Sequence, residues 1–258
     1  MTKGPVALIT GASGGLGLEF SKLCAADGYD LVLVARNEGK LYAIKNDLER
    51  RYGIAAFVCP QDLSSKDAAL NVFDYTIEHG LDVDVLINNA GFGDSGAFWK
   101  RDWERQQDMV QVDIVALMQL THCFLPQMLT RGSGKILNLS SVAAFCAGPY
   151  MSVYYASKEF VRSFSEALFE ETRGTGVTVT ALCPPPTATG FESAADMGSE
   201  SKMFRKAARA EDVARIGYKA MQKGKALCYC GAFTKLMGFG SRLVSRKVAR
   251  RFATKMDR

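Results

Sequence analysis

The stretch Val6–Gly17, VALITGASGGLG, decides the fold of this chain. Its first five residues are apolar and rich in β-branched side chains, which favours a buried strand. Glycines follow at once, and after them apolar residues recur at Leu16, Phe20 and Leu23 with helical spacing. A strand, a tight glycine turn and a helix in this order predict the first half of a βαβ unit.

Six further apolar stretches repeat the pattern along the chain. Each reads as apolar on both faces, and helix-length segments separate them. Strands of this kind, alternating with helices, are typical of a parallel sheet covered on both sides. We therefore predict a single Rossmann-type, doubly wound α/β domain over residues 1–258, with helices on both faces. The expected strands are Val6–Thr10, Asp30–Ala35, Ala55–Cys59, Val83–Ile87, Lys135–Leu139, Val177–Cys183 and Ala226–Cys230.

The composition excludes several classes of protein. The chain has 258 residues, of which 48% are hydrophobic and 23% charged, and these values exclude disordered, collagen-like and coiled-coil chains. Residues 225–258 contain nine basic residues and one acidic residue, which leaves 23 basic and 26 acidic residues, a net charge of −3, in residues 1–224. We therefore do not expect the body of the chain to bind nucleic acid.

Cysteine usage and the N-terminus predict the compartment. Seven cysteines are scattered without a CxxC pair or a histidine spacing that suits a metal, so we expect a reducing compartment and no metal site. The N-terminal residues reach glycines before the apolar core of a signal peptide could form. The longest uncharged stretches, residues 114–130 and 136–157, are interrupted by proline, glycine or polar residues, and neither resembles a membrane span. The sequence predicts a cytoplasmic protein.

The glycine turn indicates a site for a dinucleotide. Gly11, Gly15 and Gly17 follow a G-x-x-x-G-x-G spacing. Residues without Cβ let the backbone approach a pyrophosphate, and the free N–H groups at the start of a helix attract its charge. The alternative is a glycine-rich turn that binds nothing.

Arg36 indicates the form of that dinucleotide. It follows the second strand, where a site for NAD usually offers an acidic residue to the ribose. A guanidinium there suits a 2′-phosphate, so NADP(H) is favoured over NAD, and the Ser13 hydroxyl could contact the same phosphate. The alternative is a solvated surface arginine.

Four motifs along the chain resemble those of the short-chain dehydrogenase/reductase family. They are the glycine turn, Asn88-Asn89-Ala90-Gly91, Ser141, and Tyr154-x-x-x-Lys158, in this order. The resemblance extends from the first strand to about residue 230. It is greatest to ketoacyl-reductase-like members of poorly assigned specificity, a branch that also resembles enzymes acting on long acyl and steroid ketones. It implies an oxidoreductase that transfers a hydride between a nicotinamide and a carbonyl or alcohol, in a homodimer or homotetramer.

Tyr154 and Lys158 carry the chemistry in this interpretation. Four residues apart on a helix, they share one face, and a neighbouring ammonium lowers the pKa of a phenol. Tyr154 is therefore the expected general acid for carbonyl reduction. By the resemblance, Lys158 also binds the nicotinamide ribose and Ser141 holds the substrate oxygen.

Each of these residues has a plainer interpretation. A Tyr-x-x-x-Lys pair is often an ordinary helix face, and Ser140 competes with Ser141 until the spacing to the tyrosine decides for Ser141. We expect Tyr155, His79 and His122 to be structural.

The resemblance implies three further groups of cofactor contacts. They are Asp62 and Leu63 at the adenine, Asn88, Ala90 and Gly91 beside its ribose, and Thr187 and Thr189 at the nicotinamide carboxamide. The whole expected cofactor set is Gly11, Ser13, Gly15, Leu16, Gly17, Arg36, Asp62, Leu63, Asn88, Ala90, Gly91, Tyr154, Lys158, Thr187 and Thr189.

Two residues depart from the family pattern. Asp113 stands where the family commonly has an asparagine that helps to hold a helix kink and a proton-relaying water. A carboxylate could replace it by hydrogen bonding, or could pair with Lys158 and raise the lysine's pKa, so Asp113 joins the expected catalytic residues. Pro185 stands where glycine is usual, which removes a backbone donor and could alter the wall around the nicotinamide.

Two segments lie outside the alternation of strands and helices. Residues 189–211 are polar, weakly periodic and follow a strand end, where ligands bind in open α/β sheets. We expect them to form a mobile, partly helical flap. Residues 232–258 form a basic tail with amphipathic helical spacing. The tail could contact an anionic membrane surface, attract acidic substrates such as acyl-thioester carriers, or flank an oligomer contact.

Two functions from different classes follow from these observations. We expect an NADP(H)-dependent carbonyl reductase or alcohol dehydrogenase acting on a ketone, aldehyde or 3-oxoacyl substrate. The alternative is a catalytically silent NADP(H)-binding sensor or scaffold of the same fold. Asp113 and Pro185 favour the alternative, and the intact Ser141, Tyr154 and Lys158 oppose it.

Overall fold

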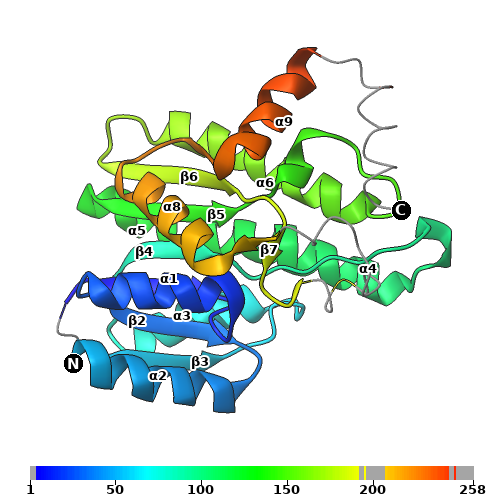
Figure 1. The fold of residues 1–258 in the computed structure, drawn as a ribbon. Helices are drawn as coiled ribbons and strands as arrows, with labels where there is room; N and C mark the ends of the chain where they lie inside the picture. Colours follow the sequence, from blue (N-terminus) through cyan, green and yellow to red (C-terminus); the bar gives the residue numbers. More distant parts are fainter. Residues whose placement is uncertain (1–3, 192–194, 196–206, 244–246, 248–258) are drawn as a thin grey trace.

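The predicted strands join into one parallel sheet in a computed structural model of the chain, which confirms the predicted fold class (Figure 1). The structure describes residues 4–191, 195, 207–243 and 247. The strand order is β3-β2-β1-β4-β5-β6-β9, and each neighbouring pair is parallel. The strands of this sheet are β1 Val6–Thr10, β2 Asp30–Ala35, β3 Ala56–Pro60, β4 Val83–Asn88, β5 Gly134–Leu139, β6 Val177–Cys183 and β9 Leu227–Tyr229.

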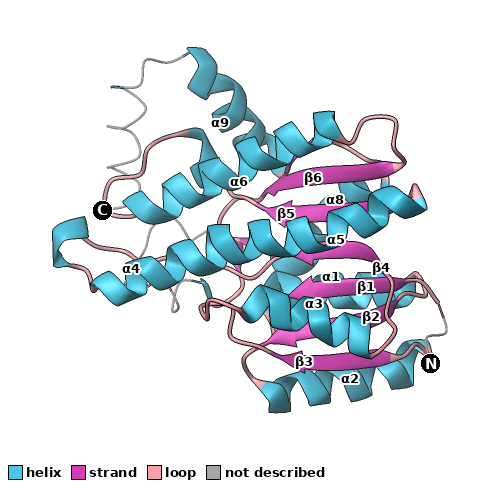
Figure 2. Cartoon of the chain, turned by 180° about the vertical axis from the view of Figure 1, so that it is seen from behind, coloured by secondary structure: helices cyan, strands magenta, loops and turns pink. Residues whose placement is uncertain are grey.

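Helices cover both faces of the sheet. Figure 1 shows α1 and α8 on one face, and Figure 2 shows α3, α5 and α6 on the other. The helices are α1 Gly15–Ala26, α2 Glu38–Tyr52, α3 Ala68–Glu78, α4 Trp103–Val110, α5 Leu117–Arg131, α6 Ser152–Glu171, α8 Ala210–Gln222 and α9 Gly231–Leu243. Shorter elements are the 3₁₀ turns η1 Phe98–Lys100 and η3 Val142–Phe145, the π-helical turn η2 Gln111–Ala116, and the two-residue strands β7 Thr187–Ala188 and β8 Ala208–Arg209.

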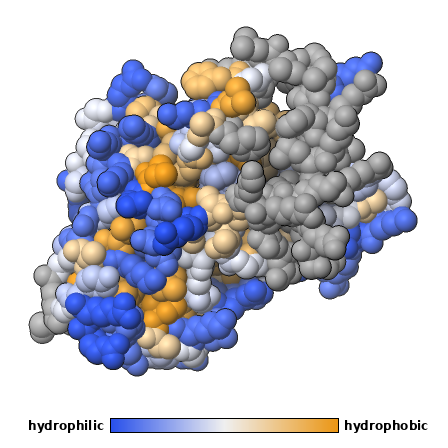
Figure 3. All heavy atoms as spheres, in the orientation of Figure 1, coloured by the Kyte–Doolittle hydropathy of each residue, from blue (hydrophilic) through white to orange (hydrophobic). Residues whose placement is uncertain are grey.

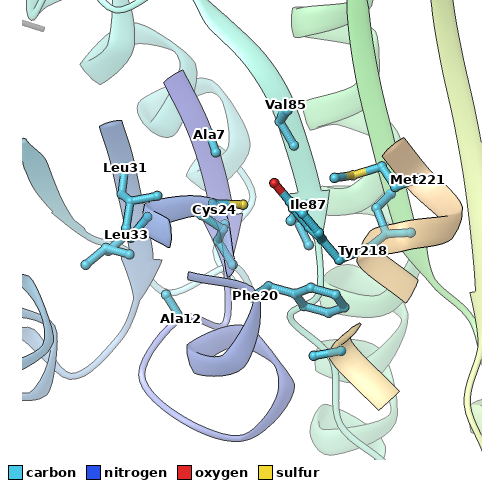
Figure 4. Close-up of a cluster of buried hydrophobic side chains, with 14 of the residues drawn as sticks. Ala7, Ala12, Phe20, Cys24, Leu31, Leu33, Val85, Ile87, Tyr218 and Met221 are labelled. Atoms are coloured by element: carbon cyan, nitrogen blue, oxygen red, sulfur yellow. The ribbon is translucent and has the colours of Figure 1, made fainter. Parts of the chain in front are cut away.

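The core explains why the strands read as continuous apolar runs. All five residues of β1 are buried, since helices pack on both of its faces. Figure 4 shows one of the two layers, in which Phe20 and Cys24 of α1 lie with Tyr218 and Met221 of α8 against the sheet. Burying each such large apolar side chain stabilises a fold by about 1.5–3 kcal/mol. A second buried cluster, formed with α3, α5 and α6, covers the opposite face.

The strand order places a binding crevice. The chain runs outward from β1 to β3 and then returns to β4 on the other side of β1. In open α/β sheets, ligands bind outside the carboxyl ends of the strands where the order reverses. The glycine turn after β1 and the Asn-Asn-Ala-Gly segment after β4 meet at this point.

The stretch from α4 to α5 corrects one expectation. Pro126 does not interrupt it: α5 continues through this proline to Arg131. The helical stretch Trp103–Arg131 is long and apolar enough to cross a membrane by length and composition alone. In this fold its buried side chains, among them Leu120 and Phe124, belong to the cluster that covers the sheet.

The two segments outside the alternation are described only in part. Of the expected flap, Phe191 and Ala195 pack near the site, Ala208–Arg209 form β8, and α8 begins at residue 210. Residues 192–194 and 196–206 lie outside the described residues. The expected tail begins as α9, whose described part ends at Leu243.

Candidate active site

A cavity of about 780 Å³ opens at the carboxyl ends of the strands, at the reversal of strand order. Most of the residues that the sequence predicts for the site line it together, although they come from segments far apart in the chain. These residues are Gly11, Ser13, Gly15, Leu16, Arg36, Asp62, Leu63, Ala90, Gly91, Ser141, Tyr154, Lys158, Thr187 and Thr189. Pro185 lines the cavity as well, whereas Gly17, Asn88 and Asp113 do not.

The glycine turn forms a cradle that side chains would fill. Gly11 and Gly15 have φ values of 66° and 53°, a region that glycine adopts without strain. A Cβ on Gly17 would lie 2.2 Å from the carbonyl oxygen of Gly11, so Gly17 lets α1 pack directly on the turn. The start of α1 therefore faces the cavity with its backbone N–H groups, which is the geometry that binds a pyrophosphate. These residues fit a dinucleotide.

The end of β2 presents more positive charge than the sequence interpretation found. Arg36, Asn37 and Lys40 all line the cavity and are exposed. Asn37 caps α2, because its Oδ1 accepts the N–H of Lys40 at 2.9 Å. Lys40 was missed, although its position in the first turn of the helix that follows Arg36 could have indicated it. Two cations at this end of the cavity suit a phosphate group.

The structure gives Asn88 a different place from the one that the resemblance implied. Its side chain is buried and donates to Thr121 Oγ1 at 3.1 Å and to Asn138 Oδ1 at 2.9 Å, so it joins β4 to β5 and α5 instead of lining the cavity. The neighbouring Asn89 lines the cavity.

Thr10 and Asn89 hold the two cofactor segments together. The Thr10 hydroxyl accepts the backbone N–H groups of Asn89 and Ala90, both at 2.9 Å. The Asn89 side chain donates to the Thr10 carbonyl oxygen at 2.9 Å. Sequence reasoning missed both roles. Thr10 ends a predicted strand and Asn89 lies inside a recognised motif, but only the pairing of β1 with β4 brings them together.

Ser141 rather than Ser140 faces the tyrosine. Ser141 hydrogen-bonds Tyr154, and its Oγ also accepts the Ala143 N–H at 3.1 Å. Ser140 turns to α6, where its hydroxyl donates to the Lys158 carbonyl oxygen at 2.8 Å. Tyr155 is buried, and its ring occupies the place of any Cβ on Gly148, which fits the structural role expected for it.

Burial is the main influence on the Tyr154 phenol. It raises the pKa of Tyr154 above its ordinary value, and Asp113 adds to the increase, while Lys158 and the hydrogen bond with Ser141 oppose it. The Lys158 Nζ lies 5.6 Å from the centroid of the Tyr154 ring. Tyr154 therefore stays protonated at neutral pH and can donate a proton there.

Asp113 pairs with Lys158, which was one of the two alternatives for this position. Its Oδ2 lies 3.0 Å from the lysine Nζ, and the carboxylate also accepts the Phe92 N–H at 3.1 Å and the Ser157 hydroxyl at 3.2 Å. Burial lowers the pKa of Lys158, but Asp113 and Tyr154 raise it to a net value above normal. A Cβ on Gly91 would lie 2.8 Å from Asp113 Oδ1 and 3.0 Å from the lysine Nζ, so the glycine leaves room for the pair.

The cavity wall beside Tyr154 has several apolar side chains, and the charged Arg105 and Asp108 also line the cavity. Met151 and Phe191 pack in one cluster with Tyr154, and the Phe191 ring centroid lies 5.2 Å from that of Tyr154. Met237 of α9 lines the cavity as well. Thr187 donates its hydroxyl to the Pro185 carbonyl oxygen at 2.7 Å, which fixes the turn after β6. This end of the site suits an apolar ligand beside the Tyr154 hydroxyl.

The two histidines lie away from the chemistry. His79 ends α3, where its ring stacks on Tyr75 with a centroid distance of 4.0 Å. His122 lies exposed on α5. Neither lines the cavity.

Comparisons with known proteins agree with this geometry. The sequence model of the short chain dehydrogenase family matches residues 5–199. A very-long-chain 3-oxoacyl-CoA reductase of Laccaria bicolor is 37% identical over 180 residues, which cover 69% of this chain and 53% of that protein. The 17-beta-hydroxysteroid dehydrogenase type 3 of Mus musculus is 35% identical over 186 residues, which cover 70% and 59% of the two chains. The chain thus matches only a little over half of the length of these relatives.

A solved structure extends the likeness to most of the chain. The short-chain dehydrogenase from Sphingobium yanoikuyae, in complex with NADPH, is 28% identical and superposes with a TM-score of 0.83. The superposition covers 93% of this chain and 94% of that one.

Proposed function

This chain belongs to the short-chain dehydrogenase family, and from that premise we propose that it is an NADP(H)-dependent oxidoreductase that interconverts a carbonyl and an alcohol. One observation carries the proposal. A single cavity joins the glycine cradle and Arg36 at one end to Ser141, Tyr154 and Lys158 at the other. A binding module would need the first set of residues but not the second.

The residues of the chain divide the chemistry between them. When bound, NADPH supplies the hydride. Ser141 holds the substrate oxygen, and Tyr154, protonated at neutral pH, donates its proton to that oxygen. Lys158 lies beside the phenol and can also bind the nicotinamide ribose. The apolar wall excludes water from the reacting atoms.

We assign the cofactor as NADP(H) rather than NAD because the end of β2 is cationic. Arg36 and Lys40 line the cavity there, at the place where an acidic residue would otherwise bind the ribose hydroxyls. The relative from Sphingobium yanoikuyae binds NADPH, which supports the same choice.

Replacing Arg36 with alanine tests this choice. We expect the Kd for NADPH to rise at least about 10-fold, since a charge-assisted hydrogen bond is worth roughly 1.5–3 kcal/mol, while the Kd for NADH changes little. Fluorescence titration measures both constants. Arg50→Ala, at the other end of α2, is the matched control and should change neither. An unchanged NADPH Kd in Arg36→Ala would refute the assignment of the 2′-phosphate site.

The substrate that the wall fits best is an apolar ketone. Met151, Phe191 and Met237 offer no charge to a ligand at Tyr154. Two relatives are named for a 3-oxoacyl thioester and for a steroid, and both substrates carry a large apolar body beside a ketone. We propose a substrate of this class, a 3-oxoacyl compound or another bulky ketone.

The rival function is a silent NADP(H)-binding sensor or scaffold. Asp113, which distinguishes this site from the family pattern, pairs with Lys158 and leaves Ser141 in contact with Tyr154. The acid and its oxygen-binding partner are thus both in place, and the enzyme is the better supported of the two. A screen of ketones and aldehydes that follows NADPH absorbance distinguishes them, because only the enzyme consumes NADPH.

Two expectations about partners and surroundings stay proposals. A homodimer or homotetramer is expected from the family resemblance. A reducing, cytoplasmic compartment is proposed from the scattered spacing of the seven cysteines.

We also propose that α9 and the basic tail contact an anionic membrane surface. Leu236 and Phe239 of α9 are 70% and 59% exposed, and Figure 3 shows this apolar patch on the surface. The sequence from residue 242 onward adds seven basic residues and one acidic one. An exposed apolar face next to dense positive charge is the pattern of an interfacial helix.

The double variant Leu236→Ser/Phe239→Ser tests this contact. We expect its binding to vesicles that contain phosphatidylserine to fall at least about 10-fold, since each apolar side chain contributes roughly 1.5–3 kcal/mol when it is buried. Sedimentation with vesicles measures the bound fraction. Ile77→Ser removes another exposed apolar side chain, on α3, and should have no effect. Equal sedimentation of the double variant and the wild type would exclude the proposed contact.

A further inference from the structure

Proton donation by Tyr154 does not itself require a buried carboxylate beside Lys158, yet Asp113 provides one. Asp113 has no exposed surface, and the Lys158 side chain is 6% exposed. Three groups hold the carboxylate in place: the lysine ammonium, the Ser157 hydroxyl and the Phe92 N–H. Lys158 lines the cavity and Asp113 does not, and because both side chains are buried, little water screens their charges.

The Asp113 carboxylate changes the electrostatic field at the Tyr154 phenol. An ammonium alone would favour the phenolate form of Tyr154. A carboxylate 3.0 Å from the same ammonium opposes that field, because its negative charge lies next to the positive one. Asp113 also acts on the phenol directly, in the direction that favours the protonated form.

Among the described residues, only Lys158 and Asp113 act as charges on the Tyr154 phenol. On α4, which packs against η2, Arg105 is paired with Asp94 at 2.9 Å and Asp108 is exposed. On α5, His122 is exposed and Arg131 lies 3.7 Å from Asp82. The lysine's second acceptor, the Leu139 carbonyl oxygen at 3.4 Å, is uncharged. Among the described residues, the electrostatic balance at the phenol is therefore set by Lys158 and Asp113.

We propose that Asp113 is a positioning residue that sets the working direction of the site: its carboxylate opposes the charge of Lys158 and, together with burial, keeps Tyr154 protonated, so that the site donates a proton over the neutral range and accepts one only under alkaline conditions. The inference rests on the proposed function and deepens it, since it makes the chain a reductase. The pair cannot change the equilibrium of the reaction. It changes the pH range in which each direction runs.

Reduction and oxidation need different protonation states of Tyr154. In reduction, the phenolic O–H bond breaks as the substrate oxygen gains its proton, and the phenolate that remains takes a proton from solvent before the next turnover. In oxidation, the phenolate must exist first, because it accepts the proton of the alcohol. A phenol that stays protonated at neutral pH favours carbonyl reduction and disfavours alcohol oxidation.

Asp113→Asn tests the proposal, since it removes the charge and keeps the size and the acceptor oxygen of the side chain. We expect the phenolate of Tyr154 to form at a pH at least about one unit lower than in the wild type. The measurement is the near-ultraviolet absorbance of phenolate across a pH titration, taken as the difference between each protein and the same protein carrying Tyr154→Phe. The acidic limb of kcat/KM for alcohol oxidation should move down by the same amount.

Ser157→Ala is the matched control. It removes a hydrogen bond to the same carboxylate and leaves the charge in place, so the phenolate should form within about 0.3 pH units of the wild-type value. A phenolate that forms in Asp113→Asn at the wild-type pH or above would overturn the proposal, as would an equal shift in Ser157→Ala. The titration needs no substrate. If the wild type reduces no carbonyl, the proposed function fails, while the role of Asp113 is still decided.

Discussion

Tyr154→Phe is expected to lower kcat/KM for carbonyl reduction by about 10³-fold, within the range that general acid catalysis contributes. The substitution keeps the ring and its packing against Phe191 and Tyr155, which lie 5.2 and 6.2 Å away between ring centroids. It removes only the hydroxyl that hydrogen-bonds Ser141, which is the proposed proton donor. The rate of NADPH oxidation with the best ketone or aldehyde of the screen measures the loss, and the Kd for NADPH should stay within a few-fold of the wild-type value.

Tyr155→Phe is the control for this prediction. Tyr155 is the neighbouring phenol, and it packs over Gly148, so its hydroxyl should be dispensable and turnover should stay within about threefold. The assignment of the general acid is wrong if the effects of the two substitutions are reversed. A wild-type protein that binds NADPH and turns over no carbonyl would favour the sensor or scaffold instead.

Lys158→Met is expected to abolish turnover and to lower the free energy of unfolding by about 3–5 kcal/mol, the usual cost of leaving a buried charge without its partner. Asp113 would lose the ammonium 3.0 Å away and keep only the Ser157 and Phe92 donors. Burial already raises the pKa of this carboxyl against the pull of Lys158, and without the lysine the increase is larger. A folded-state pKa above the unfolded one means that stability falls as pH rises, so the deficit should be larger at pH 8 than at pH 5. Urea denaturation at the two pH values measures it.

Two controls separate the charge from the packing. Asp113→Asn combined with Lys158→Met removes both charges, and we expect it to recover most of the stability but none of the turnover. Lys22→Met removes the cation of a partly exposed surface pair with Glu19 and should cost less than about 1 kcal/mol. A Lys158→Met protein that loses no more stability than Lys22→Met would show that the buried pair is not a coupled unit.

The strands were predictable because of how parallel sheets are buried. Helices cover both faces of β1, β2 and β6, so each of these strands is a short apolar run with turn residues after it. The remaining ends moved by one residue, as in β3, which begins at Ala56 rather than Ala55. Hydrogen bonding between strands determines the first and last residue of each strand, and the spacing of apolar residues in the sequence gives no information about those hydrogen bonds.

The site was predictable where a motif fixed both the residue and its surroundings. Gly17 could be assigned from spacing, because the turn permits no Cβ there. Asn88 could not be assigned from the motif, because adjacent residues at a strand end point to opposite faces. The Asn88 side chain enters the core, and that of Asn89 lies at the cavity. Thr10 has no signal of its own, because its role depends on a segment that only the pairing of β1 with β4 brings to it. Lys40 could have been found from its position in the first helical turn after Arg36.

The number of residues in the π-helical turn at Gln111–Ala116 determines whether Asp113 faces Lys158. Regular α-helix turns by about 100° per residue, and a wide turn accommodates one residue more than an α-helical turn would. Deleting a single residue there would restore an ordinary helix and rotate one flank against the other by that angle. The Asp113 carboxylate could then no longer face Lys158 while the flanking helices kept their apolar sides on the sheet. An insertion or deletion at this point would therefore disable the site even though every residue proposed for the chemistry stayed the same.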